Sequence, residues 1–332
     1  MKHANISIFI PHIGCPHRCS FCDQRTISGT QRAPSANDVR SICEKALCEV
    51  KSPENTEIAF FGGSFTAIPR GYMTELLETA REFIGTGKFR GIRISTRPDC
   101  IDSEILRILK KNGVTSIELG AQSMCDDVLE ANERGHSAED VANACALIRE
   151  HGFELGLQMM CGLYGSTEKN EFETIDRIIE LSPDTVRIYP VVILKGTKLA
   201  ELLESGEYKP FEFDTVLDIC SDALMRFSYE KIKVIKCGLH ASEFVEKDMV
   251  GGFYHPAFRE LCENLIYRRR TEEFIAFHEP RDNIYKIAVN RSCISKAAGH
   301  KRSNIEYFRK SHTEVKFIGD ENIPIYEIGE VK

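Results

Sequence analysis

The residues with the clearest chemistry are Cys15, Cys19 and Cys22, which form a Cys-x-x-x-Cys-x-x-Cys motif near the start of the chain. Three thiolates so close together can bind a metal ion or an iron–sulfur cluster. A structural zinc site needs four closed ligands, and an electron-carrying [4Fe-4S] cluster needs four cysteines, but no fourth cysteine lies nearby. The motif therefore favours a [4Fe-4S] cluster with one iron open to a substrate. The alternative is a zinc site completed by His17 or by a distant residue.

Short β-rich runs alternate with amphipathic segments of helical period over the first two thirds of the chain. The predicted strands are 6–10, 57–61, 92–95, 116–119, 154–159 and 186–189. The predicted helices between them are 37–49, 72–84, 102–112, 138–151 and 171–181. This alternation demands a parallel sheet with right-handed crossovers, and six such units predict a partial (β/α)6 barrel of TIM type. Functional residues should lie at the carboxyl ends of its strands, and the cysteine motif directly follows the first strand.

The alternation ends after Lys195, and helical segments follow around 199–203 and 213–229. From residue 285 the order is strand 285–289, helix 292–298, a turn at 299–302, helix 304–310 and strand 314–318. We therefore expect a core at 1–208 and a small α+β region at 209–332 that contains a compact βααβ unit.

The motif CxxxCxxC, with aromatic Phe21 before its last cysteine, resembles the signature of the radical S-adenosylmethionine (SAM) superfamily. Further segments resemble, in order, the radical domain of the elongator catalytic subunit: 61–66 (FGGSFT), 95–99 (STRPD), 118–123 (ELGAQS), 134–136 (RGH), 186–190 (VRIYP) and 195–197 (KGT). This likeness runs from about residue 11 to 208. Oxygen-independent coproporphyrinogen oxidase is similar, but it typically has a glutamate-containing motif where this chain has STRP. That departure favours the elongator-like branch.

The resemblance implies a partial barrel and a [4Fe-4S] cluster held by Cys15, Cys19 and Cys22. In the superfamily, the open iron binds the amino and carboxylate groups of SAM. An electron from the cluster then cleaves a carbon–sulfur bond to give a 5′-deoxyadenosyl radical. The resemblance also implies an external one-electron donor such as flavodoxin or ferredoxin.

The resemblance extends to residues that would contact SAM. These are Phe21, Gly62, Gly63, Ser64, Gln122, Arg134, Gln158 and Met160. The segment 62–64 is expected to bond the methionyl amino group, although a tight turn alone would also use two glycines. Arg134 is expected to pair with the methionyl carboxylate, and its alternative is a solvated charge at a helix end.

The other two matched positions lie on the fifth strand. Gln158 is expected to bond the ribose hydroxyls, and Met160 is expected to touch adenine through its backbone. A methionine packed in the core is the alternative for Met160.

Other side chains at the strand ends have several interpretations. Arg97 and Tyr189 either touch substrate or cofactor or brace the mouth of the barrel. Cys100, Cys125 and Cys161 also lie near strand ends, and we expect them to be buried thiols, as we do the remaining cysteines.

Two basic segments in the C-terminal region could bind RNA. The run 268–270 (RRR) on a predicted helix is more often a solvated face than a site. The turn 299–302 resembles the Gly-x-x-Gly turn of a KH core, although Arg302 replaces the second glycine. RNA contact at Lys301 and Arg302 is one hypothesis, and a small lid that packs on the barrel is the other. The chain ends before an acetyltransferase domain would be complete, so we do not expect acetyl chemistry as in the elongator subunit.

Composition limits the remaining possibilities. The 332 residues are 42% hydrophobic and 28% charged, which is typical of a globular protein. No run approaches the roughly 20 apolar residues of a membrane span, and thirteen cysteines without a secretory signal indicate a cytoplasmic protein. The net charge of -7 requires any nucleic-acid site to be local.

The leading hypothesis is an elongator-like radical SAM enzyme that modifies a tRNA base. One alternative is a coproporphyrinogen-oxidase-like enzyme that acts on a tetrapyrrole or another small metabolite. The other is a zinc-stabilised RNA-binding module without catalysis.

Overall fold

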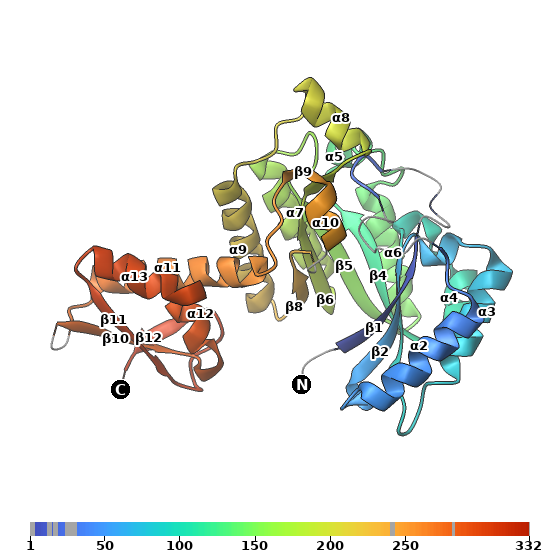
Figure 1. The fold of residues 1–332 in the computed structure, drawn as a ribbon, viewed down its shortest axis with the longest axis horizontal. Helices are drawn as coiled ribbons and strands as arrows, with labels where there is room; N and C mark the ends of the chain where they lie inside the picture. Colours follow the sequence, from blue (N-terminus) through green and yellow to red (C-terminus); the bar gives the residue numbers. More distant parts are fainter. Residues whose placement is uncertain are drawn as a thin grey trace.

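The structure is a computed structural model that describes residues 4–11, 15, 19–23, 32–239, 243–280 and 283–331. A curled sheet wrapped by helices forms the larger part of the molecule, and a smaller unit built from the C-terminal residues lies beside it (Figure 1). The long helix α11 (Phe258–Phe277) runs between the two parts.

The main sheet is parallel, and its strands lie side by side in the order in which they occur in the chain. They are β1 (Ala4–Ile10), β2 (Thr56–Gly62), β3 (Gly91–Thr96), β4 (Val114–Gln122), β5 (Glu154–Cys161), β6 (Thr185–Pro190) and β8 (Lys233–Cys237). The first six confirm the predicted strands. The seventh, β8, was not predicted and pairs in parallel with β6, so the sheet reaches into the part of the chain expected to be C-terminal region.

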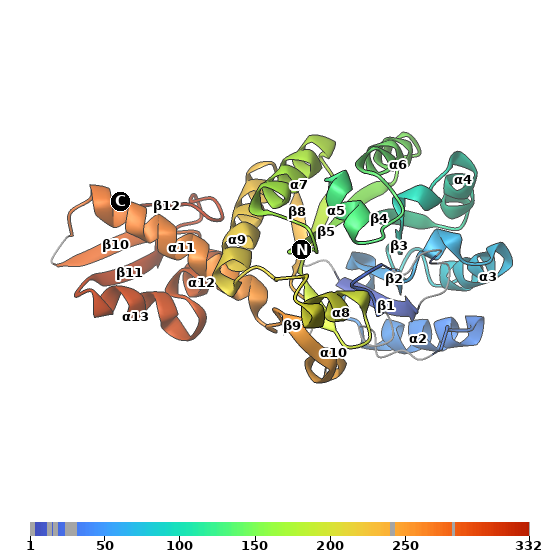
Figure 2. The same ribbon diagram turned by 90° about the horizontal axis from the view of Figure 1, so that it is seen from above.

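Helices surround the convex face of the sheet, as Figure 2 shows from above. They are α2 (Ala36–Glu49), α3 (Arg70–Arg81), α4 (Ser103–Lys111), α6 (Ala138–Glu150), α7 (Glu168–Leu181) and α9 (Phe213–Tyr229). Several begin at strong N-caps: Ser35 and Ser137 each accept a hydrogen bond from an aspartate N–H three residues later, and that aspartate bonds back to the cap. These paired caps fix where the helices begin and hence the lengths of the loops at the strand ends.

The concave face of the half-barrel is polar at its base rather than filled with apolar layers as in a closed barrel. The fully buried Arg93 donates to Glu57 at 2.7 Å, to Glu118 at 3.2 Å and to Glu154 at 2.5 Å, and these carboxylates come from three other strands. A buried guanidinium requires such partners, because an unpaired buried charge is very costly. This network forms the floor beneath the cavities described below.

A second small sheet lies on the open side of the half-barrel, at the end where the strands finish (Figures 1 and 2). It pairs β7 (Val192–Leu194) with β9 (Met249–Gly252) in antiparallel fashion. The helices α5 (Asp126–Ala131), α8 (Lys198–Ser205) and α10 (Glu243–Asp248) lie at the same end. These elements cover part of the mouth of the half-barrel.

The C-terminal unit is a three-stranded sheet with helices on one face (Figure 1). Its elements are β10 (Ile284–Val289), α12 (Ile294–Ala298), α13 (Ser303–Lys310), β11 (Glu314–Gly319) and β12 (Ile328–Glu330). The predicted βααβ order is confirmed, with β10 and β11 parallel and β12 added antiparallel to β10. Between α12 and α13 the backbone of Lys301 and Arg302 is left-handed, and both side chains are exposed.

The side chains of the basic run 268–270 on α11 contact other residues of the protein. Arg269 pairs with Asp218 of α9 at 2.7 Å, and Arg270 pairs with Glu273 at 3.2 Å. The guanidinium of Arg268 stacks over a tyrosine ring of α13 at 5.0 Å. The run therefore joins α11 to its neighbours rather than forming a separate basic surface.

Candidate active site

The cysteine loop is fixed to the elements at the mouth of the barrel through Ser20. The Ser20 hydroxyl donates to the side chain of Asn132 at 2.7 Å, and the Ser20 N–H donates to the Asn132 carbonyl at 3.2 Å. The Ser20 carbonyl accepts from Leu199 N–H of α8 at 2.8 Å. These bonds place Cys19 and Cys22 over the ends of the strands.

Cys15, Cys19 and Cys22 are partly exposed, and all three line one cavity. Residues 12–14 and 16–18 of the same loop lie outside the described residues, and so does His17, the alternative zinc ligand. Within the described ranges, no three His, Cys, Asp or Glu side chains are grouped as a metal site. The predicted cluster ligands therefore share a cavity, and their role as a set is not tested by the geometry.

Cations lie beside the loop thiols. Burial raises the pKa of the Cys15 thiol, while a hydrogen bond from the Ser64 N–H and the charges of Arg97 and Arg134 act in the opposite direction. Arg134 donates directly to the Cys19 sulfur at 3.0 Å. Positive charge of this kind stabilises thiolates, which are the form that binds metals.

Arg134 is buried, with 5% of its surface exposed, so the alternative of a solvated helix-end charge is wrong. Besides Cys19, it donates to the carbonyl of Gly120 at 2.7 Å, and its guanidinium lies 5.9 Å from the ring centre of Phe21. Its Nε is buried and has no hydrogen-bond partner among the described residues. The expected pairing with a carboxylate remains a prediction.

Gly62 ends β2 in a conformation that side chains rarely adopt, with φ of +113°. A Cβ at this position would lie 2.7 Å from the carbonyl oxygen of Ile10 at the end of β1. The next residue, Gly63, donates its N–H to that same oxygen at 2.8 Å. The glycine pair therefore lets the loop after β2 approach the cysteine loop after β1.

Ser64 continues this loop and is buried against β3. Its hydroxyl shares a hydrogen bond of 2.8 Å with Thr96, whose hydroxyl is also 2.6 Å from that of Thr66. The Ser64 side chain is thus occupied by the scaffold, and its backbone N–H faces Cys15. A backbone role for Ser64 is favoured over a side-chain role.

Gln122 and Gln158 line both this cavity and a larger one beside it. Gln122 has a left-handed backbone, with φ of +68°, and its buried Oε1 has no partner among the described residues. The amide nitrogen of Gln158 donates to Glu118 at 2.8 Å and to Ser95 at 3.2 Å. Met160 is half-buried and lines the larger cavity.

Glu118 is a residue of the site's hydrogen-bond network that sequence reasoning missed, although it lies in the matched ELGAQS segment. It is 1% exposed and accepts two hydrogen bonds from Arg187, at 2.6 and 2.9 Å, in addition to those from Gln158 and Arg93. Despite burial, these cations and hydrogen bonds lower the pKa of Glu118. It therefore stays ionised and orients two side chains of the cavity.

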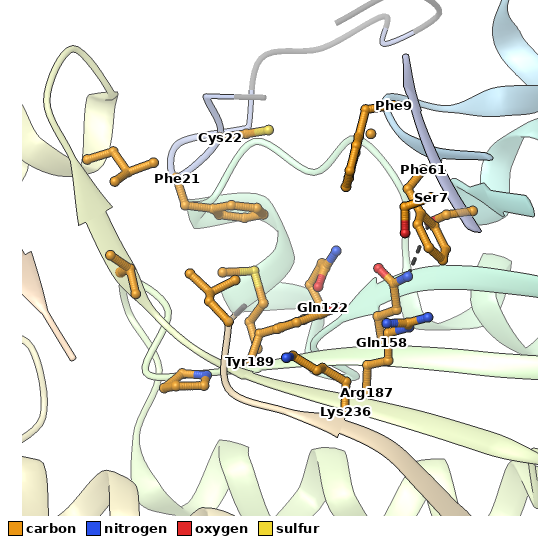
Figure 3. A pocket seen from close by; sticks show the side chains of 17 residues that line it. Ser7, Phe9, Phe21, Cys22, Phe61, Gln122, Gln158, Arg187, Tyr189 and Lys236 are labelled. Atoms are coloured by element: carbon orange, nitrogen blue, oxygen red, sulfur yellow. Dashed lines mark hydrogen bonds between the residues drawn. The ribbon is translucent and has the colours of Figure 1, made fainter. Parts of the chain in front are cut away.

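The larger cavity has a volume of about 480 Å³ and lies against the ends of β1, β2, β5, β6 and β8 (Figure 3). In Figure 3, Phe21 and Cys22 lie on one side of it, and Arg187, Tyr189 and Lys236 lie on the other. It is contiguous with the smaller cavity, since both are lined by Phe21, Cys22, Gly62, Ser95, Gln122 and Gln158. One continuous space thus connects the loop thiols to β8.

Two of the ambiguous strand-end residues now have distinct positions. Arg97 pairs with Asp99 at 2.9 Å and also bonds the carbonyl of Arg134, so it braces the mouth, although its buried Nη1 has no partner among the described residues. Tyr189 lines the larger cavity. Cys125 and Cys161 are buried as expected, whereas Cys100 is only half-buried. Among the remaining cysteines, the expectation of burial is wrong for Cys48, which is exposed on α2.

The residues present fit a bound cofactor. Three thiols line the smaller cavity, and the buried Arg134 Nε and Gln122 Oε1 beside them lack partners within the described part of the chain. Buried polar atoms are nearly always hydrogen-bonded, so these two indicate a ligand in the cavity.

The chain belongs to the radical SAM superfamily, whose profile matches residues 9–178, and a radical SAM C-terminal domain profile matches 183–268. Membership of this enzyme superfamily excludes the alternative of a zinc-stabilised binding module without catalysis. The [4Fe-4S] cluster and SAM are general features of the family. The second match extends over β8 and into α11, beyond the segment that carried the resemblance to the elongator radical domain.

Among individual proteins, the chain is similar to the tRNA uridine(34) acetyltransferase of Methanocaldococcus jannaschii, with 37% identity over 250 residues, 63% of this chain and 46% of that one. It is 31% identical over 229 residues to an uncharacterized protein of the same organism, covering 65% of this chain and 70% of that one. Elongator complex protein 3 of Saccharomyces cerevisiae is 28% identical over 52% of this chain and 35% of its own length. The chain thus spans less than half the length of these two named relatives.

Solved structures agree on the fold. Elp3 of Methanocaldococcus infernus superposes with a TM-score of 0.65 at 21% identity, over 81% of this chain and 64% of that one. Methylornithine synthase (PylB) gives a TM-score of 0.54 at 13% identity, over 95% and 84%.

None of the described helices is both long enough and apolar enough to cross a membrane.

Proposed function

We propose that this chain is an elongator-like radical SAM enzyme that modifies a base in tRNA. The observation that carries this proposal is the smaller cavity, where three thiols, Arg134 and the segment after β2 converge. The sequence relatives named as tRNA uridine(34) acetyltransferases support tRNA as the substrate class.

In this proposal Cys15, Cys19 and Cys22 hold the [4Fe-4S] cluster, and their neighbours hold SAM. The proposed SAM contacts are Phe21, Gly62, Gly63, Ser64, Gln122, Arg134, Gln158 and Met160. When bound, the cluster supplies the electron that cleaves SAM to a 5′-deoxyadenosyl radical. The protein's own part is to position the methionyl group and to hold a substrate in the larger cavity. The electron would come from an external donor such as flavodoxin or ferredoxin.

Several polar atoms of the site are placed to bind SAM in this proposal. Arg134 keeps one nitrogen unpaired beside Cys19, where a carboxylate would satisfy it. Gln158 is oriented by Glu118, so its carbonyl oxygen is left to accept from a ligand hydroxyl. The unpaired Oε1 of Gln122 is a second acceptor near the same space.

The function is tested with anaerobically reconstituted protein. We expect about four irons per chain, a broad absorbance in the blue, and 5′-deoxyadenosine after reduction in the presence of SAM. Incubation with deuterium-labelled SAM and total tRNA, followed by mass spectrometry of the nucleosides, identifies the substrate class by label exchange. Iron-loaded protein that forms no 5′-deoxyadenosine would refute the enzymatic proposal.

Contact with RNA is proposed at the turn between α12 and α13. Lys301 and Arg302 are exposed there, and neither has an ion pair or side-chain hydrogen bond among the described residues. Gly299 is required at this turn, since a Cβ would lie 2.5 Å from the hydroxyl of Ser303. The turn therefore presents two free cations in a fixed backbone conformation.

Phosphate contacts weaken as salt rises, because binding releases counterions from the nucleic acid. Replacing Lys301 and Arg302 together with alanine should weaken tRNA binding and reduce the slope of log K against log salt by about 1 to 2. Arg291→Ala is the matched control, because this exposed cation pairs with Glu321. If the parent bound no tRNA, or the double variant kept the parent's slope, the proposal of an RNA contact at this turn would be wrong.

A further inference from the structure

Lys236 is a cation inside the larger cavity that sequence reasoning did not single out. It lies on β8 directly opposite Arg187 of β6, so both side chains are on the concave face of the sheet. In Figure 3 its ammonium group points into the cavity beside Tyr189, on the side away from Phe21 and Cys22. Lys236 thus faces the space where a substrate would enter.

The ammonium group of Lys236 makes no hydrogen bond or ion pair with any described residue, although it is half-buried. Burial and the charge of Arg187 lower its pKa, and Arg259 adds to this effect. Glu118 is the carboxylate of the neighbouring network, and it is already bonded to Arg187 and other donors. Lys236 therefore has two cations nearby, and it has no carboxylate partner of its own among the described residues.

The walls around this charge are mostly apolar. They include Phe9, Phe61, Pro190, Val192, Leu194 and Leu239. A half-buried cation in such a cavity is costly unless a ligand neutralises it. Small-molecule sites commonly combine an apolar cavity with one charged group that fixes the orientation of the ligand.

We propose that Lys236 binds an anionic group, a phosphate or a carboxylate, of the molecule that the radical attacks. The inference deepens the proposed function and rests on it, because it assigns the larger cavity to the substrate. Lys236 does not line the smaller cavity, where the loop thiols and Arg134 lie. The anion of the substrate is therefore held at the β8 end of the space, and its apolar or planar part faces Phe21 and Met160.

Two sources of the anion are distinguishable. A nucleotide of tRNA would present a phosphate, and a small metabolite would present a carboxylate. Binding is measured by isothermal titration calorimetry on anaerobic holoenzyme with SAM present, using uridine 5′-monophosphate, uridine and glutarate as separate probes. A substrate nucleotide predicts binding of the monophosphate over uridine, whereas a small acid predicts binding of glutarate.

The decisive variant is Lys236→Met, which keeps most of the length of the side chain and removes its charge. Loss of one charge-assisted bond should weaken binding of the preferred anionic probe about 10- to 100-fold. Lys233→Met is the matched control, because this exposed lysine lies on the same strand. The control should bind the probe as the parent does.

Several outcomes would overturn the inference. These are an unchanged affinity of the Lys236→Met protein for the probe, no binding of either anion by the parent, or an equal loss of affinity for SAM, which would assign the charge to the cofactor. Formation of 5′-deoxyadenosine by the parent and by Lys233→Met is measured separately. Failure of that reaction refutes the proposed function, whereas a charge-dependent loss of anion binding concerns Lys236 alone.

Discussion

The chain carries two groups of cysteines in opposite surroundings. The loop thiols are Cys15, Cys19 and Cys22, which lie at the mouth of the barrel, partly exposed and beside cations. The buried thiol set is Cys161, Cys220, Cys237 and Cys262, which meets between the sheet and the helices α9 and α11.

Within the buried thiol set, the thiols bond to one another rather than to charged donors. A hydrogen bond to Cys161 and burial raise the pKa of Cys220 well above its usual range. Burial and a hydrogen bond with Cys237 do the same for Cys262. Such thiols stay protonated and behave as small apolar groups. In the loop, by contrast, the charges of Arg97 and Arg134 oppose the rise that burial gives to the pKa of Cys15. The number of cysteines therefore says less about metal binding than the charges around them.

The largest expected effect comes from Cys19→Ala. Loss of one loop thiol should remove the iron–sulfur cluster and abolish formation of 5′-deoxyadenosine, because no other described cysteine lines that cavity. Iron content and product after reduction measure this. A Cys19→Ala protein that still cleaved SAM would contradict the assignment of the loop thiols.

Arg134→Ala tests the cation that distinguishes the loop. If Arg134 pairs with the methionyl carboxylate, its loss should cost on the order of 2 to 3 kcal/mol, or tens of fold in SAM affinity. Iron content should stay near that of the parent, which separates cofactor binding from cluster assembly. Equilibrium binding of SAM to the reconstituted variant is the measurement, and an unchanged affinity would remove Arg134 from the SAM site.

Glu171, which lies next to the buried thiol set, should make the stability of the protein depend on pH. Burial raises the pKa of Glu171 to about 7, and this carboxyl also contacts Cys161. At pH values between the pKa of Glu171 in the unfolded chain and about 7, Glu171 keeps its proton in the folded protein but releases it in the unfolded chain. Stability from this group is therefore complete at low pH and lost as pH rises through 7.

Glu171→Gln should reduce the dependence of the free energy of unfolding on pH. In the parent, ionisation of Glu171 should change this free energy by at most about 3 kcal/mol. Urea denaturation at several pH values between 5 and 8 measures it. The control is Glu173→Gln on the same helix. A variant with the parent's pH slope would show that Glu171 is already ionised in the folded state.

The smallest effect is expected within the buried thiol set. Cys220→Ala removes one sulfur from a packed region and should lower the free energy of unfolding by about 1 kcal/mol. Iron content and SAM cleavage should equal those of the parent. Loss of iron in this variant would contradict the proposal that the loop thiols bind metal and the buried thiol set does not.

The sequence predicted the repeating part of the fold because each strand and helix there has a clear local pattern. β8 was missed because KVIKC is short and carries two lysines, one of which faces the cavity. The pairing of β7 with β9 joins segments about 55 residues apart, and no local pattern encodes it.

Site residues with a fixed spacing, such as the cysteines and the Gly62–Gly63 pair, were identifiable from sequence. That the cysteines bind the cluster and that the glycine pair contacts SAM stays a prediction. The network around Glu118 was not identifiable, because its partners Arg93, Gln158 and Arg187 come from three other strands. Lys236 had no signal in the sequence, since an isolated lysine is usually solvated.

The strands of the main sheet lie in space in the order in which they occur in the chain. A protein leaving the ribosome N-terminus first can therefore add each strand to an edge that has already formed. The loop thiols and the glycines after β2 belong to the first strands, and the strand that carries Lys236 is the last to be added. The side of the site that carries the loop thiols can thus form early in synthesis, and the wall that carries Lys236 is completed last.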